Sequence, residues 1–489
     1  MIIPDRVYGI ENEFGIILQM SDGTWDDEKH YLIRKMNSAA PGSMRAVAGP
    51  AKIWQSNGAC IYIDVGEHPE HATPECLLVK DAVLYAKAGE VITTGIFSRR
   101  FPDQSRFILF KNNLGCTEEG DAHISYGCHE NYLMHGKRFR EKNITDVAMV
   151  TDFIPFLITR QIMDGAGWWQ EDGTFLLSQR SLMMTTEIGE STQQNRPILH
   201  LKTTNYDTGP HHRLHLILGD SNILDVACFL KIGTTSLVLS LIESGLAPKI
   251  SYEDPVSLIK KIARDDAREI QDMCVDGTPV SAYDVQVMYC EAARRMLASS
   301  TFASSKTEAD LKNVLKLWEQ SLNAIYAHDE EWMRGRFDYA TKRFLANRQI
   351  SRMRISTDSE RQSIRKSIDL FYHNITDRTL QERMNKAWAN RRIITDKQIE
   401  KAIYFPPAGT RARMRGLFVA SLLDIQHKIF SSIEWINMGD ATSIDRYENY
   451  WMNNPLEEVS EGFKEFFLAF LDKPRGMIYS PSGDSSCEG

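Results

Sequence analysis

Hydrophobic and polar residues alternate in a β-strand pattern over the first third of the chain. Four segments there are rich in β-branched and aromatic residues and are separated by Gly, Asp and Asn, which predicts strands. They are residues 6–18, 59–65, 106–110 and 123–134. Another short apolar run follows at residues 214–218. The N-terminal part is therefore expected to form a sheet.

From about residue 223 the apolar spacing follows the helical period near 3.6. Predicted helices cover residues 256–273, 282–298, 308–327, 361–371, 377–389 and 416–433. The stretch Phe405-Pro-Pro-Ala-Gly409 interrupts them, because Pro and Gly break helices. Strands followed by helices predict an α+β fold, in which an antiparallel sheet has helices gathered on one side.

The same pattern divides the chain into three parts. A main domain is expected over residues 1–430 and a small C-terminal domain, with Trp435 and Trp451, over residues 431–479. Residues 480–489 are rich in Ser and Gly, which predicts a disordered tail.

Composition narrows the class of protein without naming a chemistry. The 489 residues are 43% hydrophobic and 25% charged, which is typical of a soluble globular protein. No run of 18 apolar residues predicts a membrane span, and the first residues do not resemble a secretory signal. The eight cysteines form no CxxC pair, so we expect reduced thiols and a cytoplasmic protein without a zinc site.

Charge is distributed unevenly along the chain. The net charge is −8, but residues 331–415 carry 20 Lys and Arg against 9 Asp and Glu, a local charge of +11. Such a segment indicates an anionic partner, such as a nucleotide, a nucleic acid or an acidic protein. Solvated helix faces are the alternative interpretation.

Two carboxylates stand close together in Tyr8-Gly-Ile-Glu-Asn-Glu-Phe-Gly15. In a strand, Glu11 and Glu13 share one face and Asn12 lies on the other. Neighbouring carboxylates repel each other, and Mg²⁺ relieves that repulsion because it prefers carboxylate oxygens. A solvent-facing polar edge is the alternative.

A second acidic group follows strand 59–65. Tyr62 and Asp64 alternate with apolar residues there, and four acids and two histidines fall within residues 64–75. An acid that ends a strand is often only a turn former. The density of ionisable groups, which includes Glu70, favours a functional site instead.

Histidines and arginines occupy two later strands. His129 and Asn131 share one strand face, with Cys128 and Glu130 on the other. On its own His129 is more typical of a buried core residue. Arg213 and His215 also share a face and suit a phosphate beside a metal, although on their own they are more typical of a surface ion-pair network.

Three arginines alternate in the run Thr410-Arg-Ala-Arg-Met-Arg-Gly416. The guanidinium group of arginine holds its N–H donors in a fixed fork that suits phosphate oxygens. A basic helix start is the alternative. No P-loop, GxGxxG, GxSxG or HExxH motif is present. If the protein uses ATP, it must therefore hold the phosphates with metals and arginines on a sheet.

Together these motifs resemble the family of Pup ligases and Pup deamidases (depupylases), closest to the Pup–protein ligase. Eight matches follow in order over residues 6–420. They are residues 9–15, 64–75, 125–132, 178–180, 196–198, 213–215 with 219–222, 231–235 and 410–416. The family belongs to the carboxylate-amine ligases, so the resemblance implies a glutamine-synthetase-like antiparallel sheet cradle packed on helices, with residues 1–430 as catalytic domain.

The resemblance also implies a mechanism. ATP with Mg²⁺ would phosphorylate the γ-carboxylate of the C-terminal glutamate of a Pup-like modifier, and a substrate lysine would then form an isopeptide bond. It implies metal ligands, or their near neighbours, at Glu11, Glu13, Glu70, His129 and His215. It places Tyr62 at the metal site, Arg213, Arg411 and Arg415 at phosphates, and Asp64 as the base that deprotonates the lysine. Neither nucleic acid nor a membrane is an expected partner.

The length of one segment bears on which family activity the chain has. The deamidase carries a long extra loop before the aspartate strand, whereas only about 23 residues separate Ile33-Arg34 from Asn57-Gly58 here, as in the ligase. Two places depart from the family's sequence motifs: Asn12 stands where the family commonly has threonine, and residues 200–205 differ. These departures make a divergent branch with a Pup-like modifier plausible. The deamidase, a small-molecule carboxylate-amine ligase and a non-catalytic binding protein are the alternatives.

Overall fold

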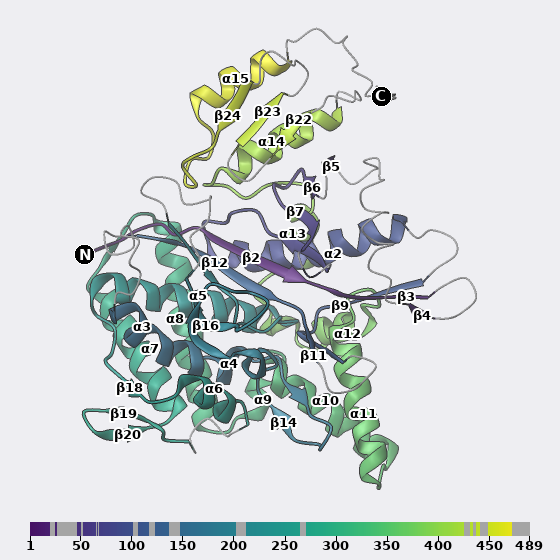
Figure 1. Cartoon of the computed structure of the whole chain (residues 1–489), viewed down its shortest axis with the longest axis vertical. Helices are drawn as coiled ribbons and strands as arrows, with labels where there is room; N and C mark the ends of the chain where they lie inside the picture. The colour runs from purple at the N-terminus through teal and green to yellow at the C-terminus, as the bar shows by residue number, and fades with distance from the viewer. Residues whose placement is uncertain are drawn as a thin grey trace, which may run out of the picture.

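The structure is a computed structural model of the chain (Figure 1). It describes residues 1–19, 25–26, 46–49, 52–64, 66, 68–100, 106–116, 123–135, 147–201, 212–264, 270–424, 431–433, 437–440 and 448–471. The predicted tail at 480–489 lies outside these residues, and so does much of the segment between Ile33-Arg34 and Asn57-Gly58.

A seven-stranded sheet forms the centre of the molecule, and every neighbouring pair in it is antiparallel. Across the sheet the strands are β17 (His212–Leu216), β12 (Cys128–Met134), β2 (Tyr8–Glu13), β8 (Pro69–Ala72), β7 (Cys60–Ile63), β6 (Lys52–Gln55) and β5 (Ala46–Gly49). The prediction of an antiparallel sheet is confirmed. The predicted segments 6–18, 59–65 and 123–134 contribute strands to it, whereas 106–110 forms β9 of a separate three-stranded sheet.

The two faces of this sheet differ in chemistry. Tyr8 and Ile10 of β2, with Tyr132 of β12, are buried on one face against the main hydrophobic core. The opposite face carries Glu11 and Glu13, as strand periodicity predicts. The sheet therefore separates a packed side from a polar side.

Helices cover the packed face. Figure 1 shows them gathered on one side of the sheet. They are α2 (Val79–Arg100), α3 (Val147–Thr159), α5 (Asp225–Ser244), α6 (Pro255–Ala263), α7 (Ala282–Ala298) and α8 (Ser305–Tyr326). Among the described helices, α5 alone is long and apolar enough to cross a membrane, but its apolar window is entirely buried inside the fold, as in a core helix.

Two further groups of elements flank this core (Figure 1). The basic segment forms α10 (Asp338–Met353), α11 (Asp358–His373), α12 (Thr379–Ala387) and α13 (Asp396–Ala402). The C-terminal unit consists of α14 (Ala412–Asp424), β22 (Ser431–Ile433), β23 (Asn437–Asp440), β24 (Glu448–Trp451) and α15 (Glu461–Leu471). Trp54 and Cys60 of the sheet share a hydrophobic cluster with α14 and α15.

Shorter elements complete the described chain. The strands are β1 (Ile2–Ile3), β3 (Gly15–Gln19), β4 (Trp25–Asp26), β9 (Arg106–Phe110), β10 (Leu114–Cys116), β11 (His123–Ser125), β13 (Trp168–Trp169), β14 (Phe175–Leu176), β15 (Thr186–Gly189), β16 (Pro197–His200), β18 (Ser251–Tyr252), β19 (Met273–Val275), β20 (Thr278–Val280) and β21 (Thr301–Phe302). The helical turns are α4 (Gln161–Asp164), η2 (Arg180–Met183), α9 (Glu330–Met333) and η3 (Ala389–Arg391).

Three sequence predictions of elements were wrong. The predicted helix 256–273 ends at Ala263, and Met273 begins β19. The predicted helix 416–433 begins four residues earlier, at Ala412, and its last three residues form β22. The strand-rich N-terminal part also contains the 22-residue helix α2. This helix shows no apolar stripe because it packs against the sheet and against α5 and α13 at once.

Candidate active site

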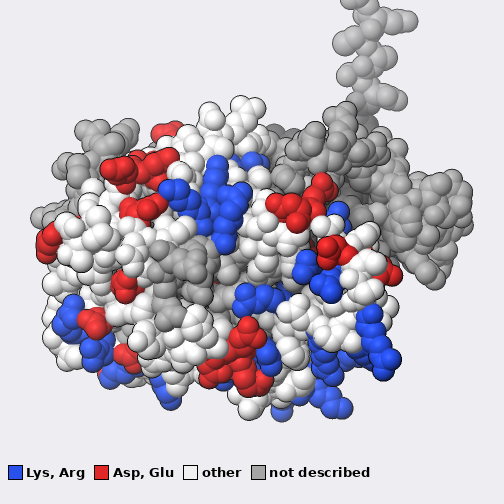
Figure 2. Space-filling model, turned by 90° about the horizontal axis from the view of Figure 1, so that it is seen from below, with Lys and Arg blue, Asp and Glu red and all other residues white. Residues whose placement is uncertain are grey.

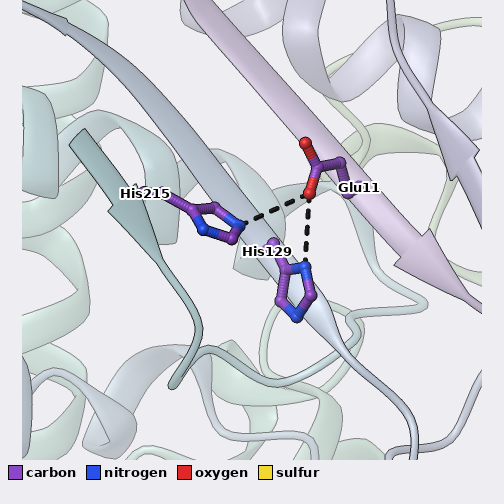
Figure 3. A group of neighbouring side chains, drawn as sticks. All are labelled: Glu11, His129 and His215. Atoms are coloured by element: carbon purple, nitrogen blue, oxygen red, sulfur yellow. Dashed lines mark hydrogen bonds and ion pairs between the residues drawn. The ribbon is translucent and has the colours of Figure 1, made fainter. Parts of the chain in front are cut away.

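The polar face of the sheet brings Glu11, His129 and His215 together from three adjacent strands (Figure 3). Glu11 Oε2 lies 3.2 Å from His129 Nδ1 and 3.4 Å from His215 Nε2. Its other oxygen accepts a hydrogen bond of 3.1 Å from Asn131 and lies 3.6 Å from the guanidinium of Arg213. The predicted sharing of a strand face by His129 and Asn131, and by Arg213 and His215, is confirmed.

A second group lies beside the first on the same face. Glu13 of β2 stands opposite Glu70 of β8, and Glu70 stands opposite Tyr62 of β7. His129 joins the two groups, because its Nε2 lies 3.8 Å from Glu13 and its Nδ1 3.9 Å from Glu70. Glu130, on the helix-facing side of β12, is instead paired with Arg160 at 2.5 Å.

Burial of so many carboxylates shifts their pKa values in opposite directions. Burial and the charges of Glu11 and Glu13 raise the pKa of Glu70 well above its usual value. Burial also acts on Glu11, but contacts with His129 and His215 and the charge of Arg213 bring its pKa well below the ordinary range. One carboxylate of the cluster is thus poorly compensated by the protein alone.

The donor atoms fit a divalent cation. Three sets of three, Glu11/His129/His215, Glu13/Glu70/His129 and Glu13/Asp64/His68, each offer ligand atoms that lie within 4.8 Å of one another. Burial lowers the pKa of His215 to about 3, so its imidazole is neutral at pH 7 and able to act as a ligand. Carboxylate oxygens dominate the combined set, as Mg²⁺ requires.

Asp64 lies directly after β7, at the Glu13 side of the cluster. Its Oδ1 accepts the backbone N–H of His68 at 2.6 Å, which fixes the carboxylate. His68 Nδ1 lies 3.5 Å from Glu13 and 3.7 Å from Asp64. Burial and the Glu13 carboxylate raise the pKa of Asp64. His68 was not singled out in the sequence, although it stands in the acid-rich stretch after Asp64.

A cavity of about 340 Å³ opens at the other end of the cluster. Glu11, Tyr62 and His215 line it, together with three cationic side chains: Lys52, Arg213 and Arg411. Lys52 was missed by the sequence analysis. It reaches the site because β6 places it opposite Tyr62, a pairing that no local pattern reveals.

Arg411 and Arg415 take different positions around Glu75. Arg411 lines the cavity, pairs with Glu75 at 2.9 Å and donates to the carbonyl oxygen of Met452. Arg415 is fully buried, is paired with Glu75 and with the carbonyl of Gly58, and does not line the cavity. The expectation that Arg415 faces a phosphate is therefore not supported by its position, because α14 turns it into the protein.

Known protein sequences resemble this chain over most of its length. Residues 6–438 match the model of a family described as Pup-ligase protein. A Pup–protein ligase of Acidimicrobium ferrooxidans is 32% identical over 448 residues, which cover 88% of this chain and 92% of the relative. A Pup–protein ligase of Kineococcus radiotolerans is 31% identical over 450 residues, covering 88% and 93%.

Two solved structures are also similar. The complex of the prokaryotic ubiquitin-like protein Pup with its ligase PafA gives a TM-score of 0.80 at 26% identity, over 96% of this chain and 92% of that one. PafA in complex with ADP gives a TM-score of 0.73 at 27% identity, over 87% and 91%. Both likenesses extend over nearly the whole fold that carries the carboxylate and histidine cluster.

Proposed function

The chain belongs to the Pup ligase family, and from this premise we propose that it joins a Pup-like modifier to protein lysines in an ATP-dependent reaction. The observation that carries the proposal is the cluster of acids and histidines at the mouth of a cavity lined by arginines, in a fold shared with PafA. The γ-carboxylate of the modifier's terminal glutamate takes the γ-phosphoryl group of ATP, and ADP leaves. The lysine amine then displaces phosphate and forms an amide.

The cavity is the proposed nucleotide site. Arg213 and Arg411 supply fixed positive charge for the phosphates, and Tyr62 lies beside them against the metal ligands. Lys52 adds a third cation. Since no P-loop is present, these side chains and the cation ligands are the groups that position the phosphates.

Glu11, Glu13, Glu70, His129 and His215 are the proposed holders of Mg²⁺. When bound, the ions offset the phosphate charge that builds during transfer. Glu11 orients His129 and His215 at one end, and Glu13 orients His68 at the other. Burial and the charges of Glu11 and Glu13 raise the pKa of Glu70, and a bound cation would offset the repulsion between these carboxylates, which supports this assignment.

Asp64 is the proposed general base. Its carboxylate is fixed by the His68 backbone at the end of the cluster away from the cavity, where the lysine must approach the acyl phosphate. A lysine is protonated near pH 7 and becomes nucleophilic once Asp64 accepts its proton. We place this chemistry in the cytoplasm, in a catalytic domain over residues 1–430 with a small domain over residues 431–479, and α14 is the part of the catalytic domain that packs against the small domain.

The proposed function is tested by incubating the protein with ATP, Mg²⁺, a Pup-like modifier ending in glutamate and a lysine-bearing protein. A mass increase on lysine equal to the modifier minus one water supports ligation. If ATP is consumed but no lysine gains mass with any such modifier, the chain is not a ligase of this type.

Replacing Arg411 by Ala should weaken the use of ATP by roughly 1.5–3 kcal/mol, the range for a hydrogen bond to a charged group. The reason is that Arg411 is buried beside the cavity and paired to Glu75. The Michaelis constant for ATP and the ADP affinity measure the effect. Arg413→Ala is the matched control, since Arg413 lies two residues further on in the first turn of α14, is half exposed and pairs with Glu458. Equal behaviour of the two variants would remove Arg411 from the nucleotide site.

Binding of the acidic modifier should weaken steeply as salt is raised, because the basic helices attract it through screened surface charge. Exposed bases on α10–α13 are Arg348, Arg352, Arg354, Lys366, Arg383, Lys386, Lys397 and Lys401. Figure 2 shows Lys and Arg in several groups, separated by acidic groups, on the face seen from below. Fluorescence anisotropy of a labelled modifier at low and high salt measures the effect.

The double change Arg348→Glu and Arg352→Glu should weaken the same binding, whereas Lys312→Glu on α8 is the control. A dissociation constant that does not change with salt would point to an apolar groove instead.

A further inference from the structure

The cluster has two chemically different ends. The described residues that line the nucleotide cavity include Glu11 and His215, but not Glu13, Asp64 or His68. The nucleotide therefore enters at the Glu11 end. The Glu13 end is left for the modifier's carboxylate, which takes the phosphoryl group from ATP, and for the lysine, which then attacks the acyl phosphate.

Strand β16 runs beside this cluster with one functional side chain at each end. At its C-terminal end, the ring of His200 contacts that of His215, with centroids 4.9 Å apart. Arg196 precedes its first residue, at the other end of the strand, and the charge of Glu13 raises the pKa of its guanidinium against the lowering by burial. β16 thus places Arg196 at the Glu13 end, away from the nucleotide cavity.

The guanidinium of Arg196 is available to an anion. Its Nε donates to the carbonyl oxygen of Thr192 at 3.0 Å, and no carboxylate of the described residues forms an ion pair with it. Arg196 is half-buried, and burial lowers its pKa, with Glu13 opposing that shift. A partly desolvated cation without a close counter-ion gains strongly from an anionic ligand.

A second arginine strengthens this preference. Arg180 is fully buried at the start of η2, where it donates to the hydroxyl of Ser125 at 2.5 Å and to the carbonyl of Ile217 at 2.6 Å. No carboxylate of the described residues forms an ion pair with Arg180. Burial and, in the same direction, the positive charge of Arg196 lower its pKa to about 10. Two neighbouring like charges are stabilised by an anion near both.

We propose that Arg196 binds the α-carboxylate of the modifier's terminal glutamate and thereby presents the γ-carboxylate for phosphorylation. This inference rests on the proposed function. A C-terminal glutamate has two carboxylates of similar chemistry, so the enzyme needs a group that holds one of them away from the phosphoryl donor. The planar guanidinium matches a carboxylate in two parallel hydrogen bonds. The γ-phosphate of ATP is the other anion that Arg196 is able to meet.

Arg196→Gln, with two modifiers, distinguishes these anions. One modifier ends in glutamate, and the other ends in isoglutamine, which has an α-carboxamide and a free γ-carboxylate. We expect Arg196→Gln to raise the KM for the first modifier by about 10- to 100-fold, as for a lost hydrogen bond between charged groups. For the second modifier the wild type should already show the raised KM, and the substitution should add nothing.

Two further variants serve as controls. Arg196→Lys keeps the charge but loses the fork, so its KM should lie between those of the wild type and Arg196→Gln. Gln194→Ala changes an exposed residue of the same loop and should behave as the wild type. Unchanged ADP affinity in all variants shows that the fold is intact.

Other results overturn the proposal. A raised KM for ATP with unchanged KM for both modifiers would place Arg196 on a phosphate. Equal increases in KM for both modifiers would show that Arg196 does not bind the α-carboxylate. If the wild type ligates neither modifier, the proposed function itself is wrong. If the wild type ligates both modifiers with equal KM, only the proposed recognition of the α-carboxylate is wrong.

Discussion

Replacing Asp64 by Asn should leave ADP affinity nearly unchanged while slowing isopeptide formation by roughly 10²–10⁴-fold, the range for a lost general base. The asparagine side chain would keep the shape and the hydrogen bond from the His68 backbone, so the turn after β7 should persist. It would not accept a proton from the lysine. Any reverse hydrolysis should be lost as well, because the same carboxylate would activate water. Calorimetry with ADP and quantification of ligated product by mass spectrometry measure the two effects separately.

The control for this substitution is His68→Asn, which keeps the backbone N–H that holds Asp64. Ligation by this variant should exceed that of Asp64→Asn, since the proton acceptor is still present. If Asp64→Asn abolishes nucleotide binding instead, Asp64 is a metal ligand. If ligation survives at the wild-type rate, Asp64 is only the residue that ends the strand.

Glu11→Ala should reduce metal-dependent ATP turnover by about 10²-fold or more, since even partners of metal ligands typically contribute 10- to 100-fold to metal affinity. Glu11 contacts both His129 and His215, so its loss removes a donor and releases two others. Glu70→Ala should act similarly in the second group. ATP hydrolysis or ligation measured against Mg²⁺ concentration checks this, and excess Mg²⁺ should restore only part of the rate.

A carboxylate outside the cluster provides the comparison. Glu319→Ala removes a half-exposed acid of α8 and should leave the Mg²⁺ dependence unchanged. Full turnover by the wild type in excess EDTA would contradict the entire metal assignment, whatever the variants do.

The polar face was predictable because strand periodicity is local. Glu11 and Glu13 alternate with Ile10 and Asn12 in the sequence, and two residues per repeat is enough to assign them to one face. Pairing between strands was not readable in this way. Lys52 reaches the cavity because the pairing of β6 with β7 sets it opposite Tyr62.

Helices were harder to predict where they are buried on all sides, because they then lack the polar stripe that marks a helix in the sequence. The pattern of α7 was visible, because one side is exposed and the other is packed, and its predicted bounds are correct. α2 is contacted on several sides and therefore has no polar stripe that separates it from a strand-rich region. Arg415 shows the same limit for a single residue: the alternating arginines predicted a basic run, but only the packing of α14 against Gly58 and Trp54 decides which arginine faces inward.

On the proposed assignment of the cavity as the nucleotide site, the contacts of Arg411 with the C-terminal unit would couple nucleotide binding to docking of that unit. Its side chain holds the carbonyl of Met452, its backbone N–H donates to the carbonyl of Pro455, and Pro455 is itself a wall of the cavity. A ligand that binds only the assembled cavity stabilises the docked unit by about 2.7 kcal/mol when its concentration is a hundred times its dissociation constant. By reciprocity, whatever pulls the C-terminal unit away weakens the hold on nucleotide by the same factor.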